Sequence, residues 1–339
     1  MSPKQFSAIG LAAAACSAVA VAVFVAANPW SVTVNEQAPL LPAVRADAAK
    51  IEGIEIGSGK EQLKLALKDG RWVVDSANGY PANAQAVRQL VLSATEADLV
   101  ERKTAKKDLH KMLGLADGEG GGTERTIRFK GADGAVIGEI LAGNTRSDVP
   151  GTSTGGTYVR RPGDDQTWLA NRPLDGTASL RDWVQTKLID LSTESIETVS
   201  LEMTGEAPLA IKRTDDKKSH ALAEMPAGKR LKHVNSIDDI VEAVSLVEFK
   251  NVRQAGSGTL PQKAGQAVLR TEKGLTATVD YFSDGKEAWV TITPSGEGEA
   301  KKQADDLAVR TKGWEFEVPL AEINATLKKR EDLLEDASS

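Results

Sequence analysis

The sequence has 339 residues, of which 42 are basic and 48 acidic, giving a formal net charge of −6 at pH 7. This modest acidity excludes the basic surface that nucleic acid binding needs, and it argues against a basic stripe for anionic headgroups. A hydrophobic content of 41% and a charged content of 27% exclude a disordered chain, and the length suits about two globular domains.

Residues 6–27 form an uncharged apolar run behind a short N-terminus that contains Lys4. As a helix rising about 1.5 Å per residue, the run would be about 33 Å long, enough to cross a hydrocarbon core of about 30 Å. The position of Lys4 places the N-terminus in the cytoplasm by the positive-inside rule. We therefore expect residues 1–5 to be cytoplasmic, residues 6–27 to be a retained transmembrane anchor, and the body to lie outside the cytoplasmic membrane.

Two other interpretations compete for this run. A cleavable signal peptide would use the small residues at 25–27 as its cleavage site, although the run is longer than a usual signal-peptide core. Lipidation of Cys16 fits less well, because apolar or small residues continue after the thiol up to Ala27. Cys16 is the only cysteine, so the body has no disulfide and no thiolate metal site.

Small residues recur at every fourth position of the run. If the run is a helix, this spacing forms a face that another helix can approach closely. The residues expected to contact a partner helix are Gly10, Ala14 and Ala18.

Residues 28–50 contain three prolines and no sustained hydrophobic period, which predicts a linker. From Ile51 the chain alternates apolar and polar residues, which predicts strands with one buried face and a hairpin at Gly70. A capped amphipathic helix should follow, with Asn83 as the cap. Its apolar stripe is Val87, Leu90, Val91 and Ala94.

A second group of strands precedes a helix. The alternation predicts strands at 124–130, 135–142, 157–161 and 166–170, and a closing helix at 180–188. Strands followed by helices on one face of an antiparallel sheet are typical of an α+β domain.

The second half of the chain repeats this pattern. The strand at 51–56 has a counterpart at 196–201, and Trp168 before Pro173-Leu174 has a counterpart in Trp314 before Pro319-Leu320. An internal duplication would give two related α+β domains, at 51–190 and 191–335, followed by a tail at 336–339. The helix stripe that repeats is Ile237, Ile240, Val241 and Val244.

Several segments resemble, in order and spacing, the bacterial family called domain of unknown function 4340. They are Gly70–Val74, Gly79–Asn83, Leu113–Leu115, Tyr158–Pro162 and Trp168–Ala170. Members of this family are typically anchored envelope proteins encoded beside components of a gliding-motility-type ABC export system. The resemblance implies an accessory role at a membrane complex, with an ABC transporter permease and associated envelope proteins as partners. It carries over no site residues.

The sequence offers little catalytic or cofactor chemistry. Residues 118–122 are dense in glycine but lack the Gly-Lys-Ser/Thr ending of a phosphate loop. The histidines have no second ligand at helical or strand spacing and are interpreted as surface residues: His110, His220 and His233. Turns or helix starts are the interpretation of four acidic pairs, at 164–165, 215–216, 238–239 and 305–306. We therefore expect no catalytic residue, no metal ligand and no cofactor.

Arg160 and Arg161 form the one cationic pair at a strand end that would bind an anionic ligand, and a solvated pair at a strand edge is the alternative and commoner interpretation. The sequence as a whole predicts a single-pass protein of the bacterial inner membrane with its body in the periplasm. The family resemblance implies the function of a non-catalytic accessory or scaffold of a cell-envelope ABC export complex. A periplasmic module that binds a glycan or lipid precursor is the second hypothesis, and an enzyme without metal or nucleotide is the third.

Overall fold

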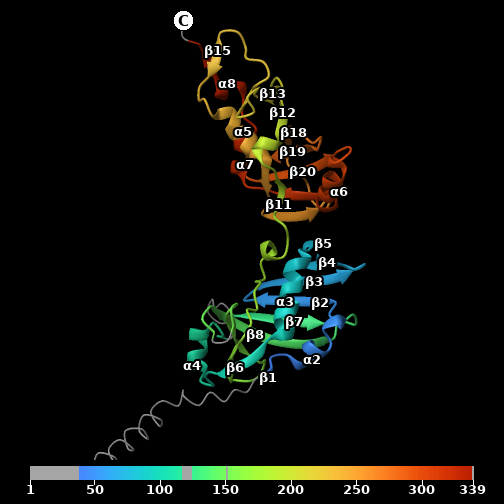
Figure 1. The fold of residues 1–339 in the computed structure, drawn as a ribbon, viewed down its shortest axis with the longest axis vertical. Coiled ribbons are helices and arrows are strands. Elements are labelled where there is room, and N and C mark those ends of the chain that lie inside the picture. The colour runs from blue at the N-terminus through green and yellow to red at the C-terminus, as the bar shows by residue number, and fades with distance from the viewer. Residues whose placement is uncertain (1–37, 117–123, 150–151, 338–339) are drawn as a thin grey trace, which may run out of the picture. The chain divides into compact units, whose positions relative to one another are not determined.

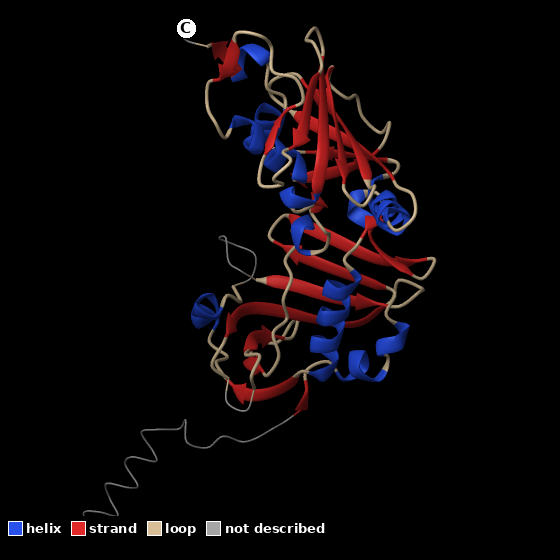
Figure 2. Cartoon of the chain, turned by 45° about the horizontal axis from the view of Figure 1, so that its top comes forward, coloured by secondary structure: helices blue, strands red, loops and turns tan. Residues whose placement is uncertain are grey.

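The computed structural model describes residues 38–116, 124–149 and 152–337. Both of its compact units combine antiparallel sheet with helices, which confirms the predicted α+β class (Figure 1, Figure 2). Unit 1 comprises residues 1–48, 92–124 and 138–174, and unit 2 comprises residues 49–91, 125–137 and 175–339. The predicted boundary at 190/191 therefore does not coincide with a boundary between these units.

Unit 1 is built on five antiparallel strands in the order β1-β6-β10-β9-β8. Apolar residues on alternate positions supply its core, as the burial of Leu99, Val159 and Leu169 illustrates. The strands are β1 (Ala38–Pro39), β6 (Asp98–Arg102), β8 (Val136–Arg146), β9 (Gly156–Arg160) and β10 (Thr167–Ala170). Among the described residues of this unit, the helices are α2 (Pro42–Ala46) and α4 (Lys107–His110), and a 3-10 turn, η4 (Lys111–Leu113), continues α4.

The N-terminal part of unit 2 has five strands in the order β7-β2-β3-β4-β5. Asp69 and Gly70 link β3 to β4 with φ angles of 50° and 75°, the left-handed pair that a tight hairpin requires. The strands are β2 (Gly53–Ser58), β3 (Glu61–Lys68), β4 (Arg71–Val74), β5 (Tyr80–Pro81) and β7 (Arg125–Lys130), with the 3-10 turn η3 (Asp75–Ala77).

The predicted cap of helix α3 (Ala84–Glu96) is confirmed. The side-chain oxygen of Asn83 accepts hydrogen bonds from the backbone N–H groups of Gln85 and Ala86, at 3.1 and 3.3 Å. These N–H groups have no partner within the helix, so the cap satisfies them. The predicted stripe is buried at Val87, Leu90 and Ala94 and half-buried at Val91.

The C-terminal part of unit 2 contains an eight-stranded antiparallel sheet in the order β14-β13-β12-β18-β19-β20-β21-β17. Its strands are β12 (Ile196–Met203), β13 (Leu209–Arg213), β14 (His220–Leu222), β17 (Asn251–Gln254), β18 (Lys263–Thr271), β19 (Thr276–Ser283), β20 (Ala288–Ser295) and β21 (Trp314–Glu317). Two strand pairs accompany it: β11 (Lys187–Asp190) with β16 (Leu246–Glu248), and β15 (Lys229–Leu231) with β22 (Leu334–Asp336).

Four helices belong to the same part of unit 2. Helix α5 (Ser236–Ser245) buries the whole of its predicted stripe and contacts α7 and β14, while α6 contacts β20. The other helices are α6 (Ala300–Thr311), α7 (Leu320–Thr326) and α8 (Arg330–Leu333), and the 3-10 turns are η5 (Leu180–Asp182) and η6 (Thr193–Ser195).

Two local predictions were wrong. The expected helix at 180–188 is the turn η5 followed by β11, because Leu188 and Ile189 are buried in a strand that finds backbone partners in β16. The expected linker at 28–50 is structured from Ala38 onward as β1, α2 and the 3-10 turn η2 (Ala48–Lys50). Burial of Leu40 and Val44 there outweighs the loop-forming tendency of the prolines.

The expected anchor at 6–27, with its partner face of Gly10, Ala14 and Ala18, lies outside the described residues. Among the helices that the structure does describe, none has the length and apolar character needed to span a bilayer.

Candidate functional site

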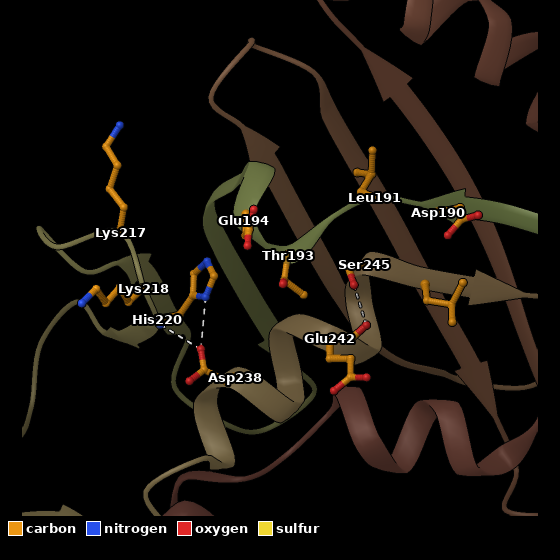
Figure 3. A pocket seen from close by; sticks show the side chains of 11 residues that line it. Asp190, Leu191, Thr193, Glu194, Lys217, Lys218, His220, Asp238, Glu242 and Ser245 are labelled. Carbon is orange, nitrogen blue, oxygen red and sulfur yellow. Dashed lines mark hydrogen bonds and ion pairs between the residues drawn. The ribbon is translucent and has the colours of Figure 1, made fainter.

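A polar cleft of about 500 Å³ lies in unit 2 where β11, η6, β14, α5 and β16 meet (Figure 3). Four carboxylates, two ammonium groups and one imidazole contribute to it, so its wall is charged and of mixed sign. The lining residues are Asp190, Leu191, Thr193, Glu194, Lys217, Lys218, His220, Asp238, Glu242, Ser245 and Leu246.

His220 and Asp238 face each other in this wall (Figure 3). The carboxylate of Asp238 accepts a hydrogen bond of 2.8 Å from the backbone N–H of His220, and the same oxygen lies 3.2 Å from Nδ1 of the ring. On the other side, Nε2 lies 3.1 Å from the carbonyl oxygen of Ile196. Both ring nitrogens are thus held by oxygen atoms of the protein, and neither offers a lone pair to the cleft.

Helix α5 positions the acidic side of the cleft. Asp238 lies in its first turn, where a carboxylate interacts favourably with the helix dipole, and Glu242 follows one turn later. Ser245 ends the helix, and its hydroxyl donates to the carbonyl of Glu242 at 2.8 Å. The carbonyl of Ser245 accepts from the N–H of Leu191, which fixes the strand-to-turn segment against the helix.

The lysines and the remaining carboxylates of the cleft differ in their partners. Lys217 points away from the His220 ring and lies 3.1 Å from Glu272, which lowers the pKa of that glutamate together with Arg213. Within the described part of the chain, the exposed side chains of Lys218, Glu194 and Glu242 form no ion pair. These three charges are the groups of the cleft that a charged ligand could bind.

The interpretation of the three histidines as surface residues was wrong for two of them. His110 is 2% exposed, and its Nε2 lies 2.9 Å from the carbonyl oxygen of Asp165. The side chain of His220 is only 6% exposed, whereas His233 is exposed as expected. Hydrogen bonds to carbonyl oxygens offset the cost of burying each ring. No periodicity in the sequence links His220 to Asp238, because the intervening loop sets their approach.

Arg160 and Arg161 have different environments. Arg160 is 4% exposed, and its guanidinium donates to the carbonyl of Asp164 at 3.3 Å and lies 4.0 Å from a carboxylate oxygen of Glu124. Arg161 is exposed. The buried guanidinium of Arg160 therefore serves the protein's own acceptors, and only Arg161 presents its charge to solvent.

The acidic pairs predicted at turns or helix starts also differ in their environments. Asp164 and Asp216 accept backbone hydrogen bonds within turns, and the pair at 238–239 begins α5, as predicted. The pair at 305–306 lies inside α6 instead, so its interpretation as a turn or helix start was wrong. Over residues 38–116, 124–149 and 152–337, no three His, Cys, Asp or Glu side chains converge as a group able to hold a metal ion.

Comparison with known families gives one match. The family model described as Domain of unknown function (DUF4340) matches residues 72–267, more than half of the chain. The chain belongs to this family. Among curated proteins and among solved structures, no match was found. The DUF4340 match begins in β4 and ends in β18, so it includes every element that lines the cleft.

In this DUF4340 chain, replacing Asp238 by alanine is expected to lower the free energy of unfolding by about 1 to 2 kcal/mol, because the His220 N–H and ring lose their acceptor. Asp239→Ala is the matched control, since Asp239 is an exposed carboxylate in the same helical turn. Urea unfolding measures the difference. Equal losses in the two variants would assign the effect to the helix dipole alone.

Proposed function

We propose that this chain is a membrane-anchored, non-catalytic accessory or scaffold protein of a cell-envelope ABC export complex. Its anchor is the uncharged run at 6–27, in the bacterial inner membrane, and its body lies in the periplasm. ABC transporter permease and associated envelope proteins are its partners, as its resemblance to DUF4340 proteins implies.

The non-catalytic part of the proposal is supported above all by the hydrogen bonding of the His220 ring. A general base needs a ring nitrogen within hydrogen-bond reach of a substrate proton, and both nitrogens of this ring face oxygens of the protein instead. Ser245, the serine of the cleft, donates its hydroxyl to a carbonyl of its own helix, and not to a side-chain base as an activated nucleophile would. The cleft therefore favours binding over catalysis.

Purification of the full chain from detergent-solubilised membranes, followed by mass spectrometry, tests the proposal. We expect the permease and ATPase of one ABC transporter to be enriched with the wild-type chain. Combined substitution A14I/A18I should reduce that enrichment if the small-residue face contacts a partner helix. Recovery without any transporter component would contradict the scaffold proposal, and undiminished recovery by A14I/A18I would move the contact to the body.

We also propose that residues 51–190 and 191–335 arose by internal duplication. The order β6-β10-β9-β8 of unit 1 corresponds to β17-β21-β20-β19, and the order β7-β2-β3-β4 corresponds to β18-β12-β13-β14. Trp168 and Trp314 lie on corresponding strands, β10 and β21, and both are half-buried. An experimental structure in which these two strands took different places in their sheets would contradict the duplication.

One observation favours a second candidate function, the binding of a glycan or lipid precursor. The cleft is of ligand size and offers Glu194, Glu242 and Lys218 without ion-pair partners in the described chain. Native mass spectrometry of protein extracted from its own membranes should then show a retained envelope component, and E194Q/E242Q should retain less of it. Absence of any retained component in the wild type would contradict this candidate.

A further inference from the structure

A short turn in unit 1 displays two apolar side chains to solvent. The turn comprises α4 and η4, with Leu109 37% exposed and Met112 75% exposed. Buried residues hold it in place: His110 inside the turn, and Leu115 directly after it, whose N–H donates to the carbonyl of His110 at 3.0 Å. The apolar tips are thus presented by a fixed scaffold.

Lysines surround these tips. Lys106, Lys107 and Lys111 are all exposed, and Lys107 lies 3.4 Å from a carboxylate oxygen of Asp165. The ammonium groups of Lys106 and Lys111 form no ion pair within the described residues.

Other charged groups in and beside the turn reduce its positive charge. Lys103 pairs with Glu101 at 2.5 Å, Asp108 is an exposed carboxylate within the turn itself, and Asp164 is an exposed carboxylate next to Asp165. The turn therefore combines exposed apolar area with three lysines against one carboxylate of its own, Asp108, in a chain whose overall charge is negative.

The described chain begins at β1, which lies in the same unit as this turn and follows the expected membrane anchor in the sequence. Ala38 in β1 pairs with Leu99 in β6, and β6 runs on to Arg102, shortly before the turn. Figure 1 shows β1, β6 and α4 within the same unit. Residues 28–37 separate β1 from the apolar run and span at most about 35 Å when extended. The turn is therefore within reach of the bilayer that would hold residues 6–27.

We propose that the turn at 106–113 docks on the anionic headgroup surface of the membrane in which the chain is anchored. Leu109 and Met112 enter the headgroup boundary, and Lys106 and Lys111 contact anionic lipid. This inference rests on the anchor of the proposed function. Each lysine strengthens such a contact by only about fivefold, so the patch is too weak to recruit a free protein. A tether supplies a high effective concentration, and the patch then sets the orientation of unit 1.

The test uses the full chain in lipid nanodiscs, with an environment-sensitive fluorophore on one cysteine and quencher groups on the lipid acyl chains. Native Cys16 reports the anchor. Met112→Cys in a Cys16→Ser background reports the turn, and Val309→Cys in the same background is the control, because Val309 is 58% exposed on α6 in unit 2. We expect quenching at position 16 in every bilayer, quenching at position 112 in bilayers with 30% anionic lipid, and none at position 309.

Charge variants separate the contribution of the lysines to membrane docking from that of the tether. K106Q/K111Q should weaken the docking equilibrium reported at position 112 by about 25-fold, whereas K301Q/K302Q, which removes two exposed lysines of α6, should leave it unchanged. Quenching at 16 but not at 112 would overturn the docking surface and leave the anchor intact. Absence of quenching at 16 would refute the anchor and with it the tethered docking.

Discussion

Replacing Tyr80 by alanine is expected to lower the free energy of unfolding by about 3 to 5 kcal/mol. Tyr80 on β5 is 1% exposed, and its ring lies edge-on to three aromatic rings of the C-terminal part of unit 2. The centroid distances are 5.6 Å to Phe249, 5.0 Å to Trp314 and 6.0 Å to Phe316. Alanine would lose these contacts and leave a cavity that close-packed rings cannot fill.

The substitution Tyr80→Phe separates the contribution of the aromatic ring to stability from that of the hydroxyl. The hydroxyl of Tyr80 is buried without a hydrogen-bond partner, and this burial raises its pKa above the usual value. Removing an unsatisfied buried hydroxyl costs no hydrogen bond, so Tyr80→Phe should keep or slightly raise stability, by up to about 1 kcal/mol. Denaturant unfolding of both variants gives the comparison. A large loss in Tyr80→Phe would show that the hydroxyl has a partner, such as an ordered water.

The Tyr80 cluster also explains why the predicted boundary at 190/191 differs from the compact units. Alternation of apolar residues identified most strands, because each sheet buries one face and the side-chain period of a strand is two. The sequence contains no comparable signal for Tyr80 meeting Phe249, since aromatic packing between distant segments has no fixed spacing. Contacts of this kind group residues 49–91 with residues 175–339.

The candidate site was predictable only in its parts. The stripe of α5 and the acidic pair at its start could be read from the sequence, because helix periodicity and N-terminal carboxylates are local signals. The approach of His220 to Asp238 depends on how β14 packs against α5, which is a tertiary contact. The wrong helix prediction at 180–188 has a similar cause, because the backbone partners that make Leu188 and Ile189 part of a strand come from β16, which is distant in sequence.

Glu322 on α7 is expected to make the stability of the protein fall as the pH rises. Burial raises the pKa of its carboxyl from 4.5 to about 8, and the negative charge of Glu248 adds to the increase, while a backbone N–H of Glu248 opposes it. Glu248 is itself held in place by hydrogen bonds from Arg181 at 2.7 Å and Thr186 at 2.8 Å. One oxygen of Glu322 is buried without a partner.

The direction of this pH dependence follows from proton binding to Glu322 in the folded and unfolded states. Between pH 4.5 and about pH 8 the folded chain holds a proton on Glu322 that the unfolded chain has released. The stabilisation from the neutral carboxyl is therefore complete below pH 4.5 and is lost as the pH rises through 8. Glu322→Gln keeps a neutral side chain at every pH, so it should exceed the wild type in stability by about 2 kcal/mol at pH 8 to 9, a value reduced for partial exposure to water.

Chemical unfolding of the wild type and Glu322→Gln at pH 4.5, 6.5 and 8.5 measures this difference. The gain should be near zero at the lowest pH and largest at the highest. Glu242→Gln is the matched control, because Glu242 is an exposed glutamate on α5 without an ion pair in the described chain, and it should show no comparable trend. A gain of equal size at all three pH values would mean that glutamine packs better than glutamate, and that the buried charge does not govern the pH dependence.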